Sequence, residues 1–321
     1  MPKETFVFIG GTGRSGTTVL SRVVGGHKAC TRFPFEFRFH VDPHGLMDLH
    51  ADLTQNWDVF RGAAAVANFK KFYEKLIAFS FHSYHNVTLK GEQKKVYQTY
   101  FEEFLKDLGI TKDKRLWIGN SPSVPKFLSL VNQKLAQPLY PEFFVTKPMD
   151  DATFFKAANS FYYKIFATEL RGKDYLVEHT PYNFLHFQFL AQVFPEAKFV
   201  HIKRFPFDII SSYTTMNWGS TEMENNAQQI IALYSQWLKK KSTFTNFIEI
   251  KLEDLAGDPK QTLKTVGDYL GIDPDAFDTS QFSDNKSNVD RWKKHADQFK
   301  ALNCFEELVA VSEALGYEVK L

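Results

Sequence analysis

Residues 6–22, FVFIGGTGRSGTTVLSR, constrain the fold of this chain more than any other stretch. The apolar residues 6–9 are typical of a buried strand, and two glycines follow them directly. Thr17 and Thr18 then lead into small and apolar residues, 19–24, which predict a helix. A glycine-rich loop between a strand and a helix gathers backbone N–H groups at the positive end of the helix dipole. The sequence therefore predicts a site for a phosphate.

The loop does not have the cation that a nucleoside triphosphate needs. Gly11 and Gly16 have the spacing of the triphosphate-binding loop, but Thr17 stands where those proteins place a lysine. The positive charge lies inside the loop instead, at Arg14. A glycine-rich turn with a packing role alone is the alternative.

A second candidate phosphate site follows the predicted strand at residues 198–202. Arg204 comes at the end of this strand, Pro206 starts a predicted helix, and Ser212 lies eight residues after the arginine. A guanidinium and a hydroxyl at one end of a sheet both suit phosphate oxygens. A P-loop kinase would place a magnesium-binding aspartate here, whereas this strand leads into Lys203 and Arg204. The strand end therefore disfavours a kinase.

Together the two motifs resemble those of sulfotransferases that use 3′-phosphoadenosine 5′-phosphosulfate (PAPS), with core motifs nearest to the tyrosylprotein and bacterial-type enzymes. The resemblance implies an α/β fold with a P-loop-like parallel sheet flanked by helices, and PAPS as donor without a metal. It assigns the 5′-phosphate to Gly13, Arg14, Ser15, Gly16, Thr17 and Thr18, and the 3′-phosphate to Arg204 and Ser212.

Residues 286–294, KSNVDRWKK, resemble the late basic segment that closes over the donor in this family. The resemblance implies donor contacts from Arg291 and Trp292, while a solvated basic turn is the alternative. Leu252 stands where relatives often have a tyrosine. If that tyrosine touches adenine, another ring must replace it here.

The predicted catalytic base lies in residues 33–45, where Glu36, Arg38 and His40 alternate with phenylalanines. Period two predicts an extended segment with these three polar groups on one side. In the resembled family, a glutamate about this far beyond the loop arginine is the general base, which implies that role for Glu36. A half-buried edge strand with solvated charges is the alternative.

His179 follows a predicted strand at residues 175–178, where relatives commonly have a lysine. A protonated imidazole could donate to the sulfonate, and a neutral one could share the base role with Glu36. A core histidine with no catalytic role is the alternative. Arg14 is suited to the negative charge that grows on the leaving phosphate oxygen.

We expect one sulfotransferase domain over residues 1–321, with a large, mainly helical insertion at 46–172 that forms a lid and the acceptor pocket. Helices are predicted at residues 68–81, 96–108 and 152–170, and a short strand at 115–118. Four histidines lie within or near this region, but they have no familiar zinc-ligand spacing, so no metal is predicted. They are His40, His44, His82 and His85.

The amino-acid composition limits the kinds of partner that the protein can bind. With 39 basic and 37 acidic residues, the chain has no strong field for nucleic acid or a membrane surface. The only cysteines, Cys30 and Cys304, are far apart, and no signal region or membrane span is evident. We expect a soluble, cytoplasmic protein that acts on a hydroxyl or amine of a small-molecule acceptor. A small-molecule kinase and a non-catalytic nucleotide-binding protein are the alternatives, and the oligomeric state is open.

Overall fold

A computed structural model of the protein describes residues 4–33, 35–85, 92–114, 142–170, 172–282 and 289–320. The chain divides into two units. Unit 1 contains Met1–Phe37 and Glu169–Leu321, and unit 2 contains Arg38–Thr168. Unit 2 therefore takes up most of the insertion predicted at residues 46–172.

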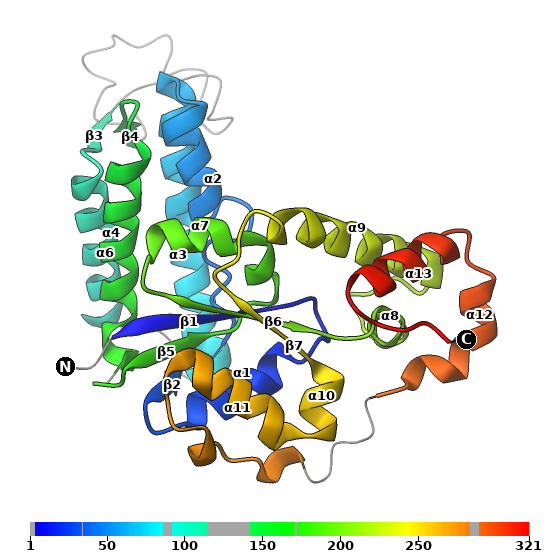
Figure 1. The fold of residues 1–321 in the computed structure, drawn as a ribbon. Helices are drawn as coiled ribbons and strands as arrows, with labels where there is room; N and C mark the ends of the chain where they lie inside the picture. The colour runs from blue at the N-terminus through cyan, green and yellow to red at the C-terminus, as the bar shows by residue number, and fades with distance from the viewer. Residues whose placement is uncertain are drawn as a thin grey trace. The chain divides into compact units, whose positions relative to one another are not determined.

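Five parallel strands form the sheet of unit 1, in the order β2-β5-β1-β6-β7 (Figure 1). On β1, Val7 lies opposite Val177 of β5 and Lys198 of β6. The predicted parallel sheet is thus confirmed. The strands are β1 (Thr5–Gly10), β2 (Cys30–Arg32), β5 (Tyr175–Glu178), β6 (Lys198–Lys203) and β7 (Ile248–Lys251).

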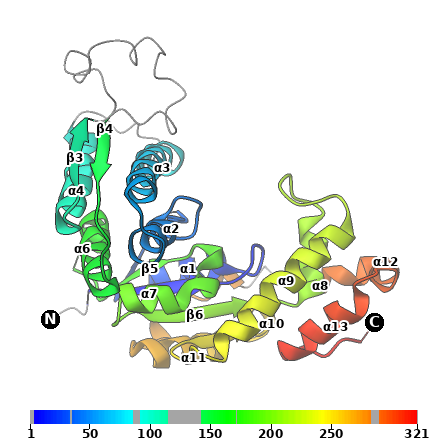
Figure 2. The same ribbon diagram turned by 90° about the horizontal axis from the view of Figure 1, so that it is seen from above.

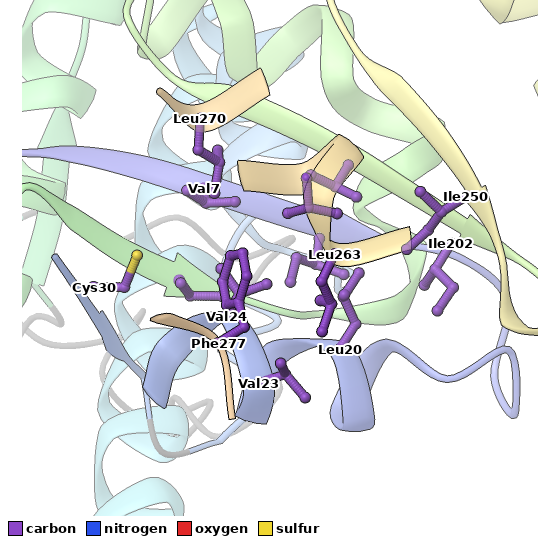
Figure 3. Close-up of a cluster of buried hydrophobic side chains, with 14 of the residues drawn as sticks. Val7, Leu20, Val23, Val24, Cys30, Ile202, Ile250, Leu263, Leu270 and Phe277 are labelled. Atoms are coloured by element: carbon purple, nitrogen blue, oxygen red, sulfur yellow. The ribbon is translucent and has the colours of Figure 1, made fainter. Parts of the chain in front are cut away.

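Both faces of the sheet are covered, which explains the continuous apolar run of β1. Val7 and Ile9 belong to a buried cluster that α1 and α11 complete with aliphatic side chains such as Leu20 and Leu263 (Figure 3). Phe6 and Phe8 contact Phe194 on the other face, with ring centroids 4.6 and 5.4 Å apart. Successive β1 residues therefore anchor helices on opposite sides.

The helices of unit 1 follow the strands in the predicted alternation, and α9 and α13 lie side by side (Figure 2). The α-helices are α1 (Thr17–Gly26), α7 (Phe187–Val193), α8 (Pro206–Tyr213), α9 (Met223–Lys241), α10 (Leu252–Gly257), α11 (Pro259–Leu270), α12 (Ala296–Lys300) and α13 (Phe305–Ala314). Shorter helical turns are η5 (Pro181–His186), η6 (Pro274–Ala276), η7 (Ser280–Phe282) and η9 (Arg291–His295).

Helix α11 shows how local sequence sets an element. The Asp258 carboxylate accepts a hydrogen bond from Gln261 N at 3.0 Å, and Pro259 is the first helical residue. Gly271 ends the helix in the left-handed conformation, with φ 71°. Local sequence therefore sets both ends of this helix.

The carboxyl ends of the strands lie at one edge of the sheet because all neighbouring pairs are parallel. From β1 the chain passes to β2 on one side, and later from β5 to β6 on the other. Such a switch point, outside the carboxyl ends, is where open α/β sheets bind ligands. A site is therefore expected among the residues that follow the strand ends at Gly10, Glu178, Lys203 and Lys251.

Unit 2 is mainly helical, as predicted, and is built on aromatic rings. Phe104 and Phe161 stack with centroids 4.5 Å apart, and Phe39, Phe69 and Tyr73 surround them. Many of the chain's aromatic residues therefore serve core packing. The elements are α2 (Leu46–His50), the π-helical η1 (Ala51–Gln55), α3 (Val59–His85), α4 (Glu92–Asp107), α6 (Asp151–Leu170) and a hairpin of β3 (Thr111–Lys114) with β4 (Glu142–Val145).

The prediction that residues 33–45 form an extended segment is wrong beyond the start of that segment. The Arg38 carbonyl accepts hydrogen bonds from Val41 N and Asp42 N, which closes a turn, and Arg38 Nη2 pairs with Asp42 Oδ1 at 2.6 Å. His40 is buried, with Nδ1 2.9 Å from Tyr162 Oη. The alternating pattern therefore reflects phenylalanines that pack into a core, not a strand.

After β5, the chain forms six residues of 3₁₀ helix from Pro181 before α7. The strand predicted at residues 115–118 lies outside the described residues, as do the side chains of His82 and His85.

Candidate functional site

The loop between β1 and α1 is held by its own hydrogen bonds and by η5. Gly11 N donates to the Pro181 carbonyl at 2.6 Å, and Ser15 Oγ donates to the Thr12 carbonyl at 2.7 Å. Gly16, directly before α1, has φ 103°, which favours glycine. Arg14 is also left-handed, with φ 64°. The loop thus has a defined shape that places Arg14 in an uncommon backbone conformation.

Two of the loop glycines lie so close to other atoms that a side chain could not be added without movement. A Cβ on Gly11 would lie 2.3 Å from the Ile202 carbonyl oxygen, and one on Gly16 would lie 2.7 Å from Leu252 Cδ1. The first N–H groups of α1 have no helical acceptor, and its first turn contains no acidic residue. An anion is therefore electrostatically favoured at this helix end.

The two predicted phosphate motifs contact each other directly. Arg14 Nε donates to Ser212 Oγ at 3.0 Å, and Arg204 Nη1 donates to the Arg14 carbonyl at 3.1 Å. Arg14 and Arg204 also line one pocket. Residues about 190 positions apart thus form one site.

This pocket has a polar and an apolar side. The polar side combines two guanidinium groups with threonine hydroxyls and the start of α1, whereas aliphatic side chains and one phenyl ring form the other side. The lining residues are Arg14, Gly16, Thr17, Thr18 and Arg204, with Val19, Leu252, Ala256, Phe282 and Val289. A ligand with phosphates at one end and a flat apolar ring at the other would match it.

Arg204 is a buried cation, only 4% exposed. Burial lowers the pKa of its guanidinium, and the carboxylates of Asp208 and Glu253 oppose that shift. Arginine nevertheless stays charged. Lys203 differs, because its ammonium donates to the Leu315 carbonyl at 2.8 Å and pairs with Glu249 at 3.3 Å. Lys203 therefore supports the fold, and Arg204 faces the pocket.

A hydrogen-bonded carboxylate lies at the end of β5. Glu178 is 1% exposed, and its Oε1 accepts from Thr180 N at 2.9 Å and from Phe37 N at 3.1 Å. Asn183 Nδ2 donates to Glu178 Oε2 and also to the Ile9 carbonyl. This network joins the ends of β1 and β5 to the backbone beside Glu36.

His179 directly follows this carboxylate and is 3% exposed. Burial lowers the pKa of His179 to about 4, although the neighbouring Glu178 opposes the shift. The imidazole is therefore neutral at pH 7. Within the part of the chain that the structure describes, its Nδ1 is buried without a hydrogen-bond partner. A neutral ring at a strand end is available for proton transfer.

Glu36 is half-buried and precedes Phe37, whose N–H is held by Glu178. Glu36 and His179 therefore both adjoin groups of one hydrogen-bonded network. The structure thus links their backbones at the carboxyl edge of the sheet.

The two late residues that the resemblance assigned to donor binding have different environments. Trp292 is 8% exposed and its ring packs on Phe205 and Phe207, with centroids 5.7 and 6.1 Å apart. Arg291 is exposed. Val289, rather than Trp292, lines the pocket.

Sequence reasoning missed several residues of this site. Ala256, Phe282 and Val289 line the pocket, but no motif identifies them. Asp208 could have been found, because it lies only four residues after Arg204, close enough in the chain to pair with it. The contact of Glu178 with Phe37 N could not, because these two residues are 141 positions apart.

No cluster of three or more His, Cys, Asp or Glu side chains that could hold a metal ion occurs among the described residues. None of the helices in that part of the chain has the length and apolar character needed to cross a membrane.

The fold and this loop define an α/β protein with a parallel sheet and a glycine-rich loop between β1 and α1. Residues 126–276 match the profile of the sulfotransferase family. The sulfotransferase domain of the Synechococcus PCC 7002 olefin synthase has a similar fold, with a TM-score of 0.52 at 15% identity over 99% of this chain and 97% of that one. Over residues 126–276 the chain is therefore similar to the sulfotransferase family, and unit 1 has the α/β fold of a sulfotransferase domain.

Curated relatives match a smaller part of the chain. The omega-hydroxy-beta-dihydromenaquinone-9 sulfotransferases Stf3 of Mycobacterium bovis and Mycobacterium tuberculosis are each 26% identical to it over 116 residues. That alignment covers 32% of this chain and 30% of each relative.

Proposed function

We propose that this protein transfers a sulfonate group from PAPS to a hydroxyl or amine of a small-molecule acceptor. The observation that carries the proposal is the direct contact of Arg14 with both Ser212 and Arg204. Two oxyanion-binding motifs in one pocket fit a nucleotide with phosphates at two positions.

The residues of the pocket fit the chemistry of PAPS. Backbone N–H groups at the start of α1, with Arg14, Thr17 and Thr18, would hold the 5′-phosphate. Arg204, a buried cation with Ser212 nearby, would hold the 3′-phosphate. Gly16 brings the loop close to Leu252, whose Cδ1 would lie 2.7 Å from a Cβ at this position.

The apolar side of the pocket fits the base of the nucleotide. Leu252 stands where a tyrosine was expected, and Phe282 supplies a ring in the same pocket. Ala256 and Val289 complete an apolar wall against which a purine could stack. We propose that Phe282 takes the place of the missing tyrosine.

When bound, PAPS supplies a sulfonate whose leaving group is a phosphate oxygen. Arg14 would stabilise the charge that develops on that oxygen, and the Ser212 hydroxyl would hold the guanidinium in place. The left-handed backbone of Arg14 fits a residue held in position for function.

Glu36 would accept the proton of the acceptor as general base. His179, neutral at pH 7, would share this role or donate one hydrogen bond from its ring N–H. Its low pKa disfavours a role as an imidazolium cation.

The acceptor class rests on two lines of support. The names of the Stf3 relatives state a hydroxylated menaquinone as their substrate, a small molecule with a hydroxyl group. We also propose that the insertion provides the lid and acceptor pocket, since such insertions commonly carry specificity.

A transfer assay tests the proposal. Purified protein is incubated with PAPS and a mixture of hydroxyl and amine acceptors, and the products are analysed by mass spectrometry. A sulfonated acceptor formed together with adenosine 3′,5′-bisphosphate is the expected result. Phosphorylated products from ATP and magnesium, with none from PAPS, would instead identify a kinase.

A further inference from the structure

A second buried carboxylate, Asp208, lies directly behind Arg204. Asp208 belongs to α8 and is 1% exposed. Its Oδ2 is 3.7 Å from Nη2 of Arg204, which lies four residues earlier in the chain. Without a partner, a buried carboxylate at this place would be strongly unfavourable. The other hydrogen-bond partners of Asp208 show which segment of the chain its carboxylate holds in place.

Both oxygens of Asp208 accept backbone hydrogen bonds from a distant segment. Trp292 N donates to Oδ1 and Asp290 N donates to Oδ2, each at 3.0 Å. Asp290 has φ 65°, a left-handed backbone conformation that turns both N–H groups toward one carboxylate. The residue between these donors is Arg291, and the residue before them, Val289, lines the pocket.

Arg204 is electrostatically coupled to two other arginines. Arg291 and Arg14 each contribute to lowering the pKa of Arg204, whereas Asp208 opposes that effect. Like charges held close together repel each other unless an anion lies near them. Asp208 is one such anion, and a phosphate in the pocket would be another.

Building on the proposed function, we propose that Asp208 is a positioning residue that sets selectivity for nucleotides with a 3′-phosphate. Its carboxylate holds the Arg204 guanidinium and the backbone of residues 290–292 in one arrangement. Arg204 and Arg291 can then act on the same phosphate. No motif of the sequence identified this link.

A carboxylate supplies both acceptors in this arrangement. Trp292 N and Asp290 N donate to different oxygens of one side chain, and an aspartate offers both oxygens. An asparagine would offer one oxygen and turn an NH₂ group toward the second N–H. Asp208→Asn therefore keeps the shape of the side chain but breaks one of the two backbone hydrogen bonds.

Two measurements on the full-length Asp208→Asn variant test the inference. Hydrogen exchange should show faster exchange at the amides of Asp290 and Trp292. Calorimetric titration should show affinity for adenosine 3′,5′-bisphosphate reduced by about tenfold or more, with affinity for adenosine 5′-phosphate nearly unchanged. Asp268→Asn, at an exposed aspartate paired with Lys264, is the control and should change neither quantity.

Equal losses for both nucleotides would reveal a general structural defect, and an unchanged affinity for the bisphosphate would show that the contact has no role in binding. Either result overturns the inference. If the wild-type protein binds neither nucleotide, the proposed function fails as well. If the wild-type protein and Asp208→Asn discriminate equally well, the inference alone fails.

Arg291→Ala provides a test that does not disturb the core, because Arg291 is exposed. This variant should also lose affinity for the bisphosphate selectively. Combined with Asp208→Asn, it should lose less than the sum of the two single effects, because both changes remove the same arrangement. Strict additivity, or an Arg291→Ala variant with unchanged affinity, contradicts the inference.

Discussion

Arg14 and Ser212 are 198 positions apart, yet Arg14 Nε donates a hydrogen bond to Ser212 Oγ at 3.0 Å. The contact joins the loop after β1 to helix α8, which follows β6. Because β1 and β6 are adjacent parallel strands, their carboxyl ends bring these two segments together. The predicted site depends on that register.

Ser212→Ala removes the hydroxyl that holds the Arg14 side chain. We expect the free energy of binding of adenosine 3′,5′-bisphosphate to weaken by about 1.5 to 3 kcal/mol, the value of one hydrogen bond to a charged group. Ser211→Ala is a matched control, because Ser211 is buried on the same helix but donates to the Phe207 carbonyl at 2.9 Å. Titration calorimetry of both variants measures the difference. Equal affinity losses would contradict a specific role for Ser212.

Arg204→Ala removes the buried guanidinium proposed to bind the 3′-phosphate. Binding of adenosine 3′,5′-bisphosphate should weaken by about 2 to 5 kcal/mol, and binding of adenosine 5′-phosphate far less. Arg204→Lys should recover only part of the loss, since lysine cannot form a bidentate contact. Losses that do not depend on the 3′-phosphate would refute the assignment.

Glu36→Gln removes the proposed general base without changing the shape of the side chain. The value of kcat should fall by about 100-fold or more, while the affinity for adenosine 3′,5′-bisphosphate stays the same. Single-turnover transfer with PAPS measures the chemical step directly. A variant with wild-type turnover would remove Glu36 from the mechanism.

The low pKa of His179 predicts a dependence of stability on pH. With a folded pKa of about 4 and an ordinary value of 6.5, the unfolded state binds more protons between these values. The contribution of His179 to stability is therefore fully present above about pH 6.5 and decreases as the pH falls toward 4. The decrease is on the order of 2 to 3 kcal/mol.

His179→Gln should abolish this part of the pH dependence, because glutamine does not titrate. Urea unfolding of the wild type and the variant at several pH values between 4 and 7 provides the measurement. Wild-type and variant stabilities that fall in parallel would show that His179 does not have the low pKa.

The sequence predicted the parallel sheet and the glycine loop, because these depend on local spacing. It could not predict the contact of Arg204 with the Arg14 carbonyl, or that of Phe37 N with Glu178, because both depend on strand register and loop packing. The extended segment at residues 33–45 was predicted wrongly for a related reason. Phenylalanine at alternate positions fits a strand, but burial around a turn produces the same pattern.

Calorimetric titration of the wild-type protein with adenosine 3′,5′-bisphosphate and, separately, with ATP and magnesium tests the central claim most directly. If the Arg14 loop and Arg204 bind the two phosphates of one adenosine nucleotide, the bisphosphate binds much more tightly than ATP and its affinity does not depend on magnesium. Tighter binding of magnesium ATP, or no binding of the bisphosphate, would contradict the account.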